Sequence, residues 1–496
     1  MAHSEAPCPV AARVEEPGPP KPSRSRWAVL AVLCVSLLLC GIDLTVLHVA
    51  VPSMSRELHP GGTALLWIVD VYALTVAALL VTCGTLGDRI GRKRMVLGGF
   101  ALFGLASAAA AFSSSTGELI AARVALGAGA AMIMASTVAL VRVVFPDDRE
   151  RAVALGLWTA AHSVGATLGP LVGGAMTERW GWGAAFLVNV PIAAAILVVG
   201  ARIIPESKNP VPRRWDLTSV ALSIGGLAVA VYALKQAGAR LAVSPGLLLA
   251  AVTGALLLLL FVRRQRRLAE PLLDFALFAD RRFSVATVCV VVCFGSYVAL
   301  LFFLTQWLQR VGGYAPLRAG LALMPLAAAN AVGAATAPWL SGRWGGRRSL
   351  TGALAAFAAA LAALSASADT GAYGSLVPLL VVAGYGAGIV MTLGADAIMG
   401  AARPERSGEA AAIQETAFEL GAGLGVAVLG TVLTGVRRLS EAAAHPALGA
   451  ARRAYDDGFA AVCGVAAAGL AVTAVLAATL LRERTPGRVK SPTTPP

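Results

Sequence analysis

The chain has 496 residues, of which 57% are hydrophobic and 14% are charged, and its formal net charge is +14. Because an average soluble domain carries about 25% charged residues, this composition argues against a water-soluble enzyme. Apolar stretches of about 20 residues recur along the chain, and that length crosses the hydrocarbon core of a bilayer. Backbone groups in lipid must be satisfied within their own segment. The composition therefore predicts an all-α, polytopic membrane protein.

Residues 1–26 are rich in proline and charge, so we expect a disordered tail before the first helix. The hydropathy pattern then predicts fourteen transmembrane helices. In chain order they cover residues 27–49, 63–83, 95–113, 118–141, 152–175, 183–204, 216–236, 244–262, 283–306, 319–340, 349–367, 375–397, 410–434 and 457–481.

Lysine and arginine are unequally distributed between the two sides that this helix pattern defines. The side of the two termini carries 30 of the 41 basic residues, and the opposite side carries 10. Cytoplasmic loops of membrane proteins are enriched in lysine and arginine. We therefore expect a multi-pass protein of the cell membrane with both termini in the cytoplasm. The same asymmetry explains the basic composition without a nucleic-acid partner.

Two short basic loops are similar to each other. Residues 86–94 read LGDRIGRKR and residues 340–348 read LSGRWGGRR, and each follows a helix that runs toward the cytoplasm. A chance likeness is the alternative, but parallel duplicated halves are typical of transporters. We therefore expect a six-helix bundle over 27–204, an inserted helix pair with basic linkers over 205–282, a second six-helix bundle over 283–481 and a cytoplasmic tail over 482–496.

Several charged residues interrupt the apolar stretches. A charge at the bilayer centre costs about 2.5–3.5 kcal/mol, so such residues usually face a cavity or a partner. Asp43, Asp70 and Arg123 are expected at a similar depth in the first, second and fourth helices. They form either an ion pair that only orders the helices or a carboxylate whose protonation alternates with substrate or conformation. Asp396 lies near a helix end, within reach of water, and is expected to be structural.

Glu415 and Glu419 are four residues apart, so both project from one face of their helix. Two carboxylates on one face require a water-filled cavity, and their repulsion favours proton uptake. Lys235 is expected only at the outer end of its helix, which leaves Arg123 as the one interior cation. A net negative lining favours a cationic or proton-exchanging ligand. The cysteines and histidines show no metal-ligand spacing, so no metal site is predicted.

The fifth predicted helix carries a stripe of small residues. Gly165, Gly169 and Gly173 fall on one face, where another backbone can approach closely. Pro170 removes an internal hydrogen bond and permits a kink. Ordinary helix packing explains the glycines alone, but together with the proline they predict a bend at a moving interface.

Several motifs along the chain resemble those of the major facilitator superfamily. Gly84 to Arg94 resembles the loop signature of the superfamily, and Arg123 to Gly127 and Gly165 to Gly174 resemble the fourth-helix and fifth-helix motifs of its drug:proton antiporters. Ile42 to Pro52 is similar to the first-helix signature of the fourteen-helix branch. Trp67 to Tyr72 and the acidic pair of the thirteenth helix resemble the quaternary-ammonium and dye exporters of that branch.

The resemblance implies two six-helix bundles plus two inserted helices, alternating access, and proton import that drives drug export without ATP or another cofactor. It implies that Arg123 takes part in proton coupling. It also implies that Gly87, Asp88, Arg89, Gly91, Arg92 and Arg94 latch the cytoplasmic side, and that Gly165, Gly169, Pro170, Gly173 and Gly174 serve the gating interface. His48 departs from the usual asparagine, and Asn330 stands where some similar dication exporters carry an acid.

We therefore expect a monomeric, proton-coupled exporter of lipophilic, cationic drugs or antibiotics rather than an enzyme. Asp43, Arg123 and Asp70 are the candidates for proton coupling, and Asp70, Glu415, Glu419 and Asn330 are the candidates for substrate binding. Two alternatives stay open, namely an uptake permease of the same fold for a metabolite and a membrane enzyme that acts on lipid-linked substrates.

Overall fold

A computed structural model of the chain describes residues 24–208, 216–240, 244–268, 271, 275–367, 373–401, 407–443 and 450–481. The predicted tail 482–496 and most of the tail 1–26 lie outside these residues, and α1 already begins at Arg24. The N-terminal group of helices comprises α1 (Arg24–Leu58), α2 (Gly62–Ile90), α3 (Arg92–Ala111), α4 (Thr116–Val144), α5 (Asp148–Trp180), α6 (Ala184–Leu187) and α7 (Asn189–Ile203). The insertion comprises α8 (Leu217–Arg240), α9 (Pro245–Gln265) and the short helix η1 (Phe275–Ala279). The C-terminal group comprises α10 (Arg281–Arg310), α11 (Pro316–Ala322), α12 (Met324–Trp344), α13 (Gly346–Ala366), α14 (Tyr373–Ala401), α15 (Ser407–Ala443) and α16 (Ala450–Leu480).

The expected all-α polytopic fold is confirmed. Thirteen helical spans in the described residues are long and apolar enough to cross a membrane. The less hydrophobic α5, with 33 residues, covers the predicted span 152–175 and packs along α1. The sixth and tenth predicted spans are each divided into two helices, α6 with α7 and α11 with α12. A proline lies near the start of the second helix in each pair, where its missing N–H is tolerated.

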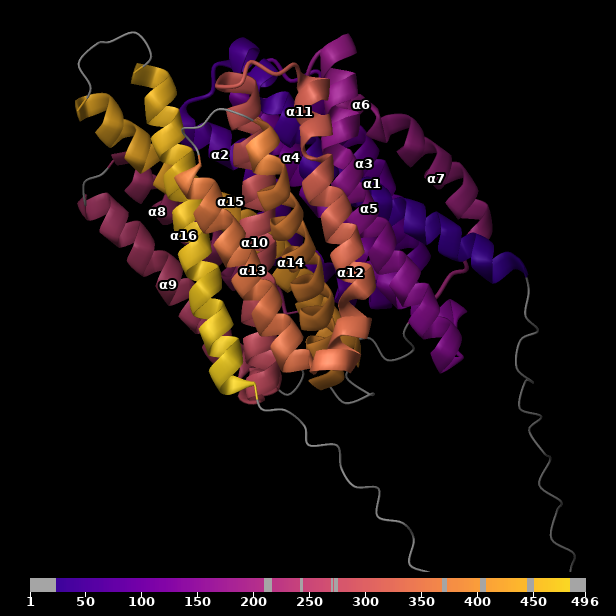
Figure 1. Cartoon of the computed structure of the whole chain (residues 1–496). Coiled ribbons are helices and arrows are strands. Elements are labelled where there is room, and N and C mark those ends of the chain that lie inside the picture. The colour runs from indigo at the N-terminus through magenta and orange to yellow at the C-terminus, as the bar shows by residue number, and fades with distance from the viewer. Residues whose placement is uncertain are drawn as a thin grey trace, which may run out of the picture.

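The helices form two neighbouring groups with the insertion at one flank. In Figure 1 the indigo and purple N-terminal group lies beside the orange and yellow C-terminal group, with α8 and α9 at one side of the view and α7 at the other. The closest pairs of helices within the N-terminal group include α1 with α5 and α2 with α4, and those within the C-terminal group include α12 with α14 and α13 with α16. Between the groups, α2 packs against α15, α1 against α10 and α5 against α11. The inserted helix α8 contacts both α2 and α15, so it bridges the two groups.

The two similar basic loops have the same backbone form. Gly91 ends α2 with a φ of 116°, Gly345 ends α12 with a φ of 87°, and the next helix starts at the following residue. Only glycine adopts such φ values readily. The two glycines occupy the same position in the two similar loops, so the repeat extends to the local conformation. We call the side of the molecule that carries these loops the motif side and the other side the opposite side.

The two groups meet closely on the opposite side. The Gln309 side-chain amide of α10 donates a hydrogen bond of 2.9 Å to the Val49 carbonyl of α1. The Leu317 backbone N–H, at the start of α11, donates a hydrogen bond of 3.1 Å to a carboxylate oxygen of Glu178 in the last turn of α5. Gly174 of α5 packs against the backbone of Pro316 so closely that a Cβ atom there would lie 2.7 Å from the carbonyl oxygen. These contacts close the space between the groups on this side.

Candidate functional site

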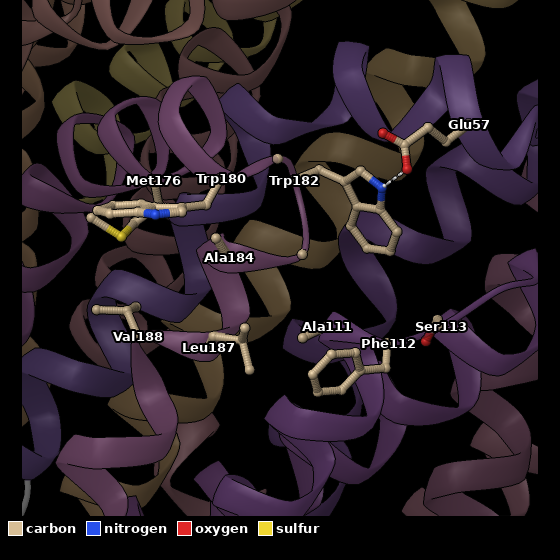
Figure 2. Close-up of a pocket in the computed structure, with 12 residues that line it drawn as sticks. Glu57, Ala111, Phe112, Ser113, Met176, Trp180, Trp182, Ala184, Leu187 and Val188 are labelled. Carbon is tan, nitrogen blue, oxygen red and sulfur yellow. Dashed lines mark hydrogen bonds between the residues drawn. The ribbon is translucent and has the colours of Figure 1, made fainter.

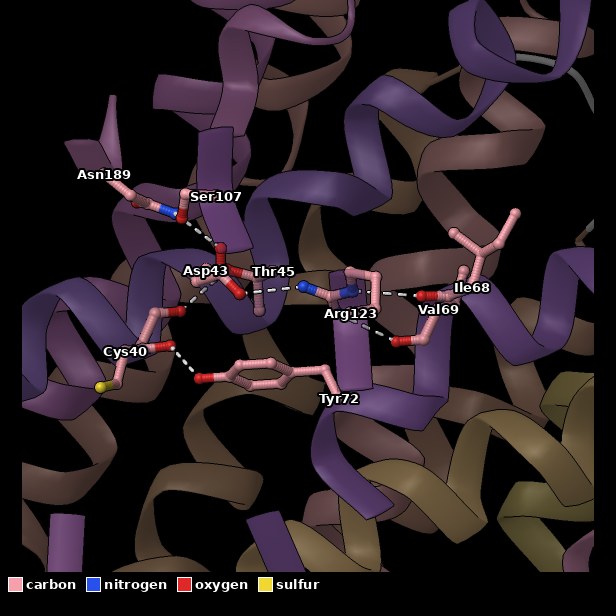
Figure 3. A network of polar contacts seen from close by, with 10 residues as sticks. Cys40, Asp43, Thr45, Ile68, Val69, Tyr72, Ser107, Arg123 and Asn189 are labelled. Atoms are coloured by element: carbon pink, nitrogen blue, oxygen red, sulfur yellow. Dashed lines mark hydrogen bonds and ion pairs between the residues drawn. The ribbon is translucent and has the colours of Figure 1, made fainter. Parts of the chain in front are cut away.

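A buried ion pair joins α1 to α4. An Arg123 guanidinium nitrogen lies 2.9 Å from an Asp43 carboxylate oxygen, and both side chains are fully buried. Figure 3 shows Arg123 reaching from α4 between Asp43 and the backbone of α2. Its other nitrogens donate to the carbonyls of Ile68 at 3.2 Å and Val69 at 3.3 Å. The guanidinium is therefore fixed by contacts with two other helices.

Aromatic rings enclose the same guanidinium. Its central carbon lies 4.7 Å from the centre of the Tyr72 ring and 6.0 Å from that of Phe186. The Tyr72 hydroxyl donates to the Cys40 carbonyl at 3.3 Å, which holds the ring between α1 and α2. A cation over a desolvated aromatic face is stabilised by the ring quadrupole, so the two rings add to the contacts that hold the Arg123 guanidinium.

Asn189 extends the network beyond the residues that the sequence singled out. Its amide nitrogen donates to the second Asp43 carboxylate oxygen at 2.7 Å and lies 3.1 Å from the Ser107 hydroxyl (Figure 3). The Asp43 carboxylate thus receives one donor at each oxygen, from α4 and α7. The only signal for Asn189 in the sequence is one amide residue within the apolar stretch 183–204.

Asp70 has a partner that the sequence analysis placed elsewhere. The Lys235 ammonium lies 2.7 Å from an Asp70 carboxylate oxygen, and both side chains are fully buried. The expectation that Lys235 lies only at the outer end of its helix, with Arg123 as the one interior cation, is therefore wrong. The helix position was assigned correctly, but the long lysine stem carries the charge inward from α8 to α2.

Glu415 and Glu419 lie on α15 and are 8% and 1% exposed. In the described part of the chain, neither carboxylate forms an ion pair with a basic side chain, and one Glu419 oxygen is buried without a hydrogen-bond partner. Glu419 lies within electrostatic reach of Cys40 and Tyr72 in the N-terminal group. One turn further along α15, Gly423 packs directly against Leu74 of α2. The acidic face of α15 is therefore turned toward the Asp43–Arg123 network.

The other acidic and amide candidates are separate from this network. Asn330 on α12 is 7% exposed, and its amide nitrogen lies 3.7 Å from the Met391 sulfur of α14. Asp396 is exposed near the end of α14. The structure thus brings together Asp43, Arg123, Asp70 and Glu419, and it leaves Asn330 in a different contact within the C-terminal group.

The glycines of α5 allow close contact between backbones. A Cβ atom at Gly165, Gly169 or Gly173 would collide with the α1 backbone or with Thr45. The Thr45 hydroxyl donates to the Ala166 carbonyl at 2.8 Å, across the same contact. Pro170 faces the C-terminal group instead, since a Cβ atom at Gly320 of α11 would collide with its carbonyl. The helix-five motif therefore has one side against α1 and one against the other group.

The loop motif after α2 is held by residues that follow α7. Arg92 donates two hydrogen bonds, of 2.7 and 3.0 Å, to one Asp88 carboxylate oxygen. Its backbone N–H donates to the Ser207 carbonyl at 2.9 Å, and Arg94 lies 3.6 Å from a Glu206 carboxylate oxygen. Gly87 packs against the side chains of α3 and α4, and Arg89 is in the last turn of α2. In the second loop Gly342 occupies the position of Asp88, so that loop lacks the acid.

A pocket of about 590 Å³ opens on the opposite side of the N-terminal group. Figure 2 shows Trp182 donating its indole N–H to Glu57, while Trp180 and Phe112 lie toward other edges of the pocket. None of its lining residues is a predicted site residue. In the described residues, no three histidine, cysteine or acidic side chains gather into a metal-ligating group.

Residues 33–426 match the family model of the Major Facilitator Superfamily. The chain belongs to this superfamily. It is 39% identical over 420 residues to the multidrug efflux pump LfrA of Mycolicibacterium smegmatis, which covers 84% of this chain and 82% of that protein. It is 37% identical to the methyl viologen resistance protein SmvA of Salmonella typhimurium, with 82% and 83% covered, and 32% identical to the tetracenomycin C resistance and export protein of Streptomyces glaucescens, with 82% and 76% covered.

The fold of the superfamily also appears among solved structures. A bacterial homologue of the human lysosomal transporter Spinster, solved in an inward-facing and occupied conformation, aligns with a TM-score of 0.65 over 92% of this chain and 96% of that chain. The sequence identity of 16% restricts this likeness to the fold. Together with the sequence relatives, it establishes the chain as a multi-pass membrane transporter.

Proposed function

We propose that this transporter exports lipophilic cations across the cell membrane in exchange for protons. In this proposal the motif side faces the cytoplasm, the bundles 27–204 and 283–481 alternate in access, and the protein acts as a monomer without a cofactor. The relatives named for multidrug efflux, methyl viologen resistance and tetracenomycin C export support an exported, drug-like cargo. Methyl viologen is a cation, which agrees with the acidic character of the site.

The acidic pair of α15 supports a cationic cargo. Among the buried acids of the described residues, Asp43 and Asp70 each contact a basic side chain, whereas Glu415 and Glu419 contact none. An unpaired buried carboxylate is unfavourable unless a proton or a cation neutralises it. The α15 pair is therefore suited to bind a cation and a proton in alternation.

The proposed cycle follows from this competition. With the motif side open, the ionised Glu415 and Glu419 bind the cation. Asp70 of α2 and Asn330 of α12 are further contacts for the cargo. After the bundles exchange access, protons bind the acids and the cargo leaves on the opposite side. Asp43 and Arg123 couple proton binding to the change of access, because their contacts join α1, α2 and α4.

The two sequence motifs have mechanical roles in this proposal. Asp88, with Gly87, Arg89, Gly91, Arg92 and Arg94, latches the motif side when it closes. The present contacts of Asp88 and Arg92 stay within the N-terminal group, as expected when that latch is released. Gly165, Gly169, Pro170, Gly173 and Gly174 provide a smooth, bendable face of α5 against which α1 and α11 move.

The experiment uses the purified protein in liposomes that are acidic inside. Wild-type protein should take up tetraphenylphosphonium, a lipophilic cation, and collapsing the pH gradient should stop this uptake. Glu419→Gln keeps the side-chain shape and removes the charge, so binding of tetraphenylphosphonium should weaken by about tenfold. Asp396→Asn removes an exposed acid from α14 and should retain wild-type uptake.

Three outcomes contradict the proposal. Uptake by the wild-type protein that is independent of the pH gradient would exclude proton exchange. Equal binding by Glu419→Gln and Asp396→Asn would remove the acidic pair of α15 from the cargo site. Accumulation of a metabolite inside whole cells, with the same dependence on Glu419, would favour an uptake permease.

A further inference from the structure

The inserted helix α8 places an ammonium group in a site on α2. The Lys235 nitrogen lies 2.7 Å from an Asp70 oxygen and 3.6 Å from the centre of the Trp67 ring. Trp67 and Asp70 are one turn apart on α2, so the ring and the carboxylate flank the ammonium together. The side chains of Asp70 and Lys235 are fully buried.

This pair of groups has the chemistry of a binding site for an organic cation. A carboxylate supplies charge, and an indole face attracts a cation most strongly when the contact is desolvated. The second Asp70 oxygen is buried and has no hydrogen-bond partner. Lys235 therefore occupies only part of the interaction capacity of the site.

Arg123 and Lys235, the two buried cations among the described residues, differ in how firmly they are held. Arg123 is fixed by Asp43 and by two carbonyls of α2. In the described residues, the Lys235 ammonium has one hydrogen-bond partner, Asp70, and one aromatic ring beside it, Trp67. Lys235 also lies five residues before the end of α8 at Arg240, and a lysine stem of four carbons can carry its charge from a buried site to a nearby surface. Lys235 is thus the cation that can be displaced.

Lys235 lies where α8 meets both helix groups. The Thr431 hydroxyl of α15 donates to the Ala427 carbonyl at 2.8 Å and lies 3.5 Å from the carbonyl of Leu234, the residue before Lys235. One turn earlier, Val231 packs with Leu74 of α2 and Ala427 of α15 in a small apolar cluster. The inserted helix α8 therefore packs against both groups at this point, and the Lys235 side chain binds the N-terminal group.

We propose that Lys235 is a tethered competitor, which fills the cation site of Trp67 and Asp70 in the absence of cargo and is displaced when a lipophilic monocation binds there. A buried carboxylate requires a neutralising partner, and lysine and cargo exclude each other at one carboxylate. The inserted helices thereby set the affinity for cations. This inference rests on the proposed function, because it takes lipophilic cations as the cargo.

The test measures tetraphenylphosphonium binding to purified protein at constant pH. Lys235→Gln removes the competing charge, so the dissociation constant should fall by about tenfold. Lys235→Arg retains a cation and should stay near the wild-type value. Adding Asp70→Asn to Lys235→Gln should abolish the gain, because the site then lacks its charge. In liposomes the KM for this cation should fall with the dissociation constant, an effect that a packing defect alone does not produce.

A second measurement needs no variant. A small amine-reactive reagent is applied to the wild-type protein, and modification of Lys235 is measured by peptide mass spectrometry. Tetraphenylphosphonium should increase the modification several-fold, since displacement exposes the amine. The exposed Lys208, which follows α7, serves as the internal reference whose modification should not change.

The outcomes separate this inference from the proposed function. If wild-type protein shows no uptake driven by the pH gradient, the proposed function fails. Uptake can instead be normal while Lys235→Gln binds tetraphenylphosphonium with the wild-type affinity and the cation does not change the modification of Lys235. Only the tethered competitor is then overturned. If Lys235→Gln does not fold, the labelling of the wild-type protein decides alone. The tethered competitor is overturned if tetraphenylphosphonium lowers the modification of Lys235 or leaves it unchanged.

Discussion

At the scale of single residues, the buried acids Asp43, Asp70 and Glu419 have different surroundings. Each Asp43 oxygen receives a donor, from Arg123 and from Asn189. One oxygen of Asp70 and one of Glu419 lack a hydrogen-bond partner. Removing one partner of a buried ion pair costs about 3–5 kcal/mol, so the saturated Asp43 pair is the most strongly coupled to its helices. A proton on Asp43 would act on all the elements that contact Arg123.

The first prediction concerns Asp43→Asn. Asparagine preserves the shape of the side chain but cannot exchange a proton, so uptake of tetraphenylphosphonium driven by a pH gradient should fall at least about tenfold. Exchange of labelled for unlabelled cation without a gradient should continue, because it needs no net proton movement. Both rates are measured in liposomes with the purified variant.

The matched control for this charge removal is Asp457→Asn, at an exposed position of α16. It should retain both gradient-driven uptake and exchange. Gradient-driven uptake at the wild-type rate in Asp43→Asn would show that the pair with Arg123 only orders the helices.

The sequence predicts some of the buried charged residues and misplaces others. Asp43, Arg123 and Glu419 stood out because each interrupts an apolar stretch, and the structure places all three in the buried centre. Lys235 was assigned to a helix end because hydropathy locates the backbone and not the tip of a long side chain. Its partner Asp70 is 165 residues away in the sequence. Such a pairing depends on how α8 packs, which no local spacing specifies.

At the scale of elements, α8 and α9 are tied together at the motif side. Asp216 precedes α8 and accepts hydrogen bonds of 2.8 and 2.9 Å from Arg264 in the last turn of α9. Hydrogen bonding to the Arg264 guanidinium lowers the pKa of Asp216 to about 2. A basic residue near a helix C-terminus also interacts favourably with the helix dipole. The pair therefore fixes the base of the insertion that carries Lys235.

The second prediction concerns the pH dependence of the stability that the Asp216–Arg264 ion pair provides. The unfolded pKa of an aspartate is about 3.9, so the stabilisation is complete above that pH and is lost as the pH falls through the folded value near 2. At about pH 6, Asp216→Asn should therefore have a lower melting temperature than the wild-type protein. The difference between the two melting temperatures should narrow as the pH falls below about 4.

Thermal unfolding followed by tryptophan fluorescence measures this difference. Arg264→Gln should reproduce both the lower melting temperature and its narrowing, and the double variant should add little. A difference that stays constant down to about pH 2.5 would show that the ion pair contributes no pH-dependent stability.

The sequence predicted the helices better than their ends. Hydropathy detects the part of a helix that matches a bilayer core of about 30 Å, or about 20 residues. The helices α1 and α15, with 35 and 37 residues, continue beyond that part as amphipathic or polar turns. The breaks at Val188 and Leu323 were also missed, because apolar residues continue through both.

At the scale of the whole molecule, the contacts between the helix groups are concentrated on the opposite side. Gln309 and Leu317 donate across the boundary there, and Gly174 and Gly320 allow α5 and α11 to touch. For access to alternate, these contacts must separate while others form at the motif side. At Gly174 and Gly320 the backbones of α5 and α11 touch directly, with no flexible side chain between them. This contact is therefore either fully formed or absent.

The last prediction tests that closure with Gly320→Val. A Cβ atom at this position would collide with the Pro170 carbonyl, and overpacking of this kind costs about 1–3 kcal/mol. The closed arrangement of α5 and α11 should lose population, so turnover should fall by about tenfold and hydrogen exchange of the C-terminal turns of α5 should rise. Gly342→Val on α12 is the control, since nothing lies within 4 Å of a Cβ there. Its turnover and exchange should match the wild type. Normal turnover in Gly320→Val would mean that α5 and α11 need not touch during transport, and the closure of the opposite side would then depend on the other contacts between the groups, such as α1 with α10 and α2 with α15.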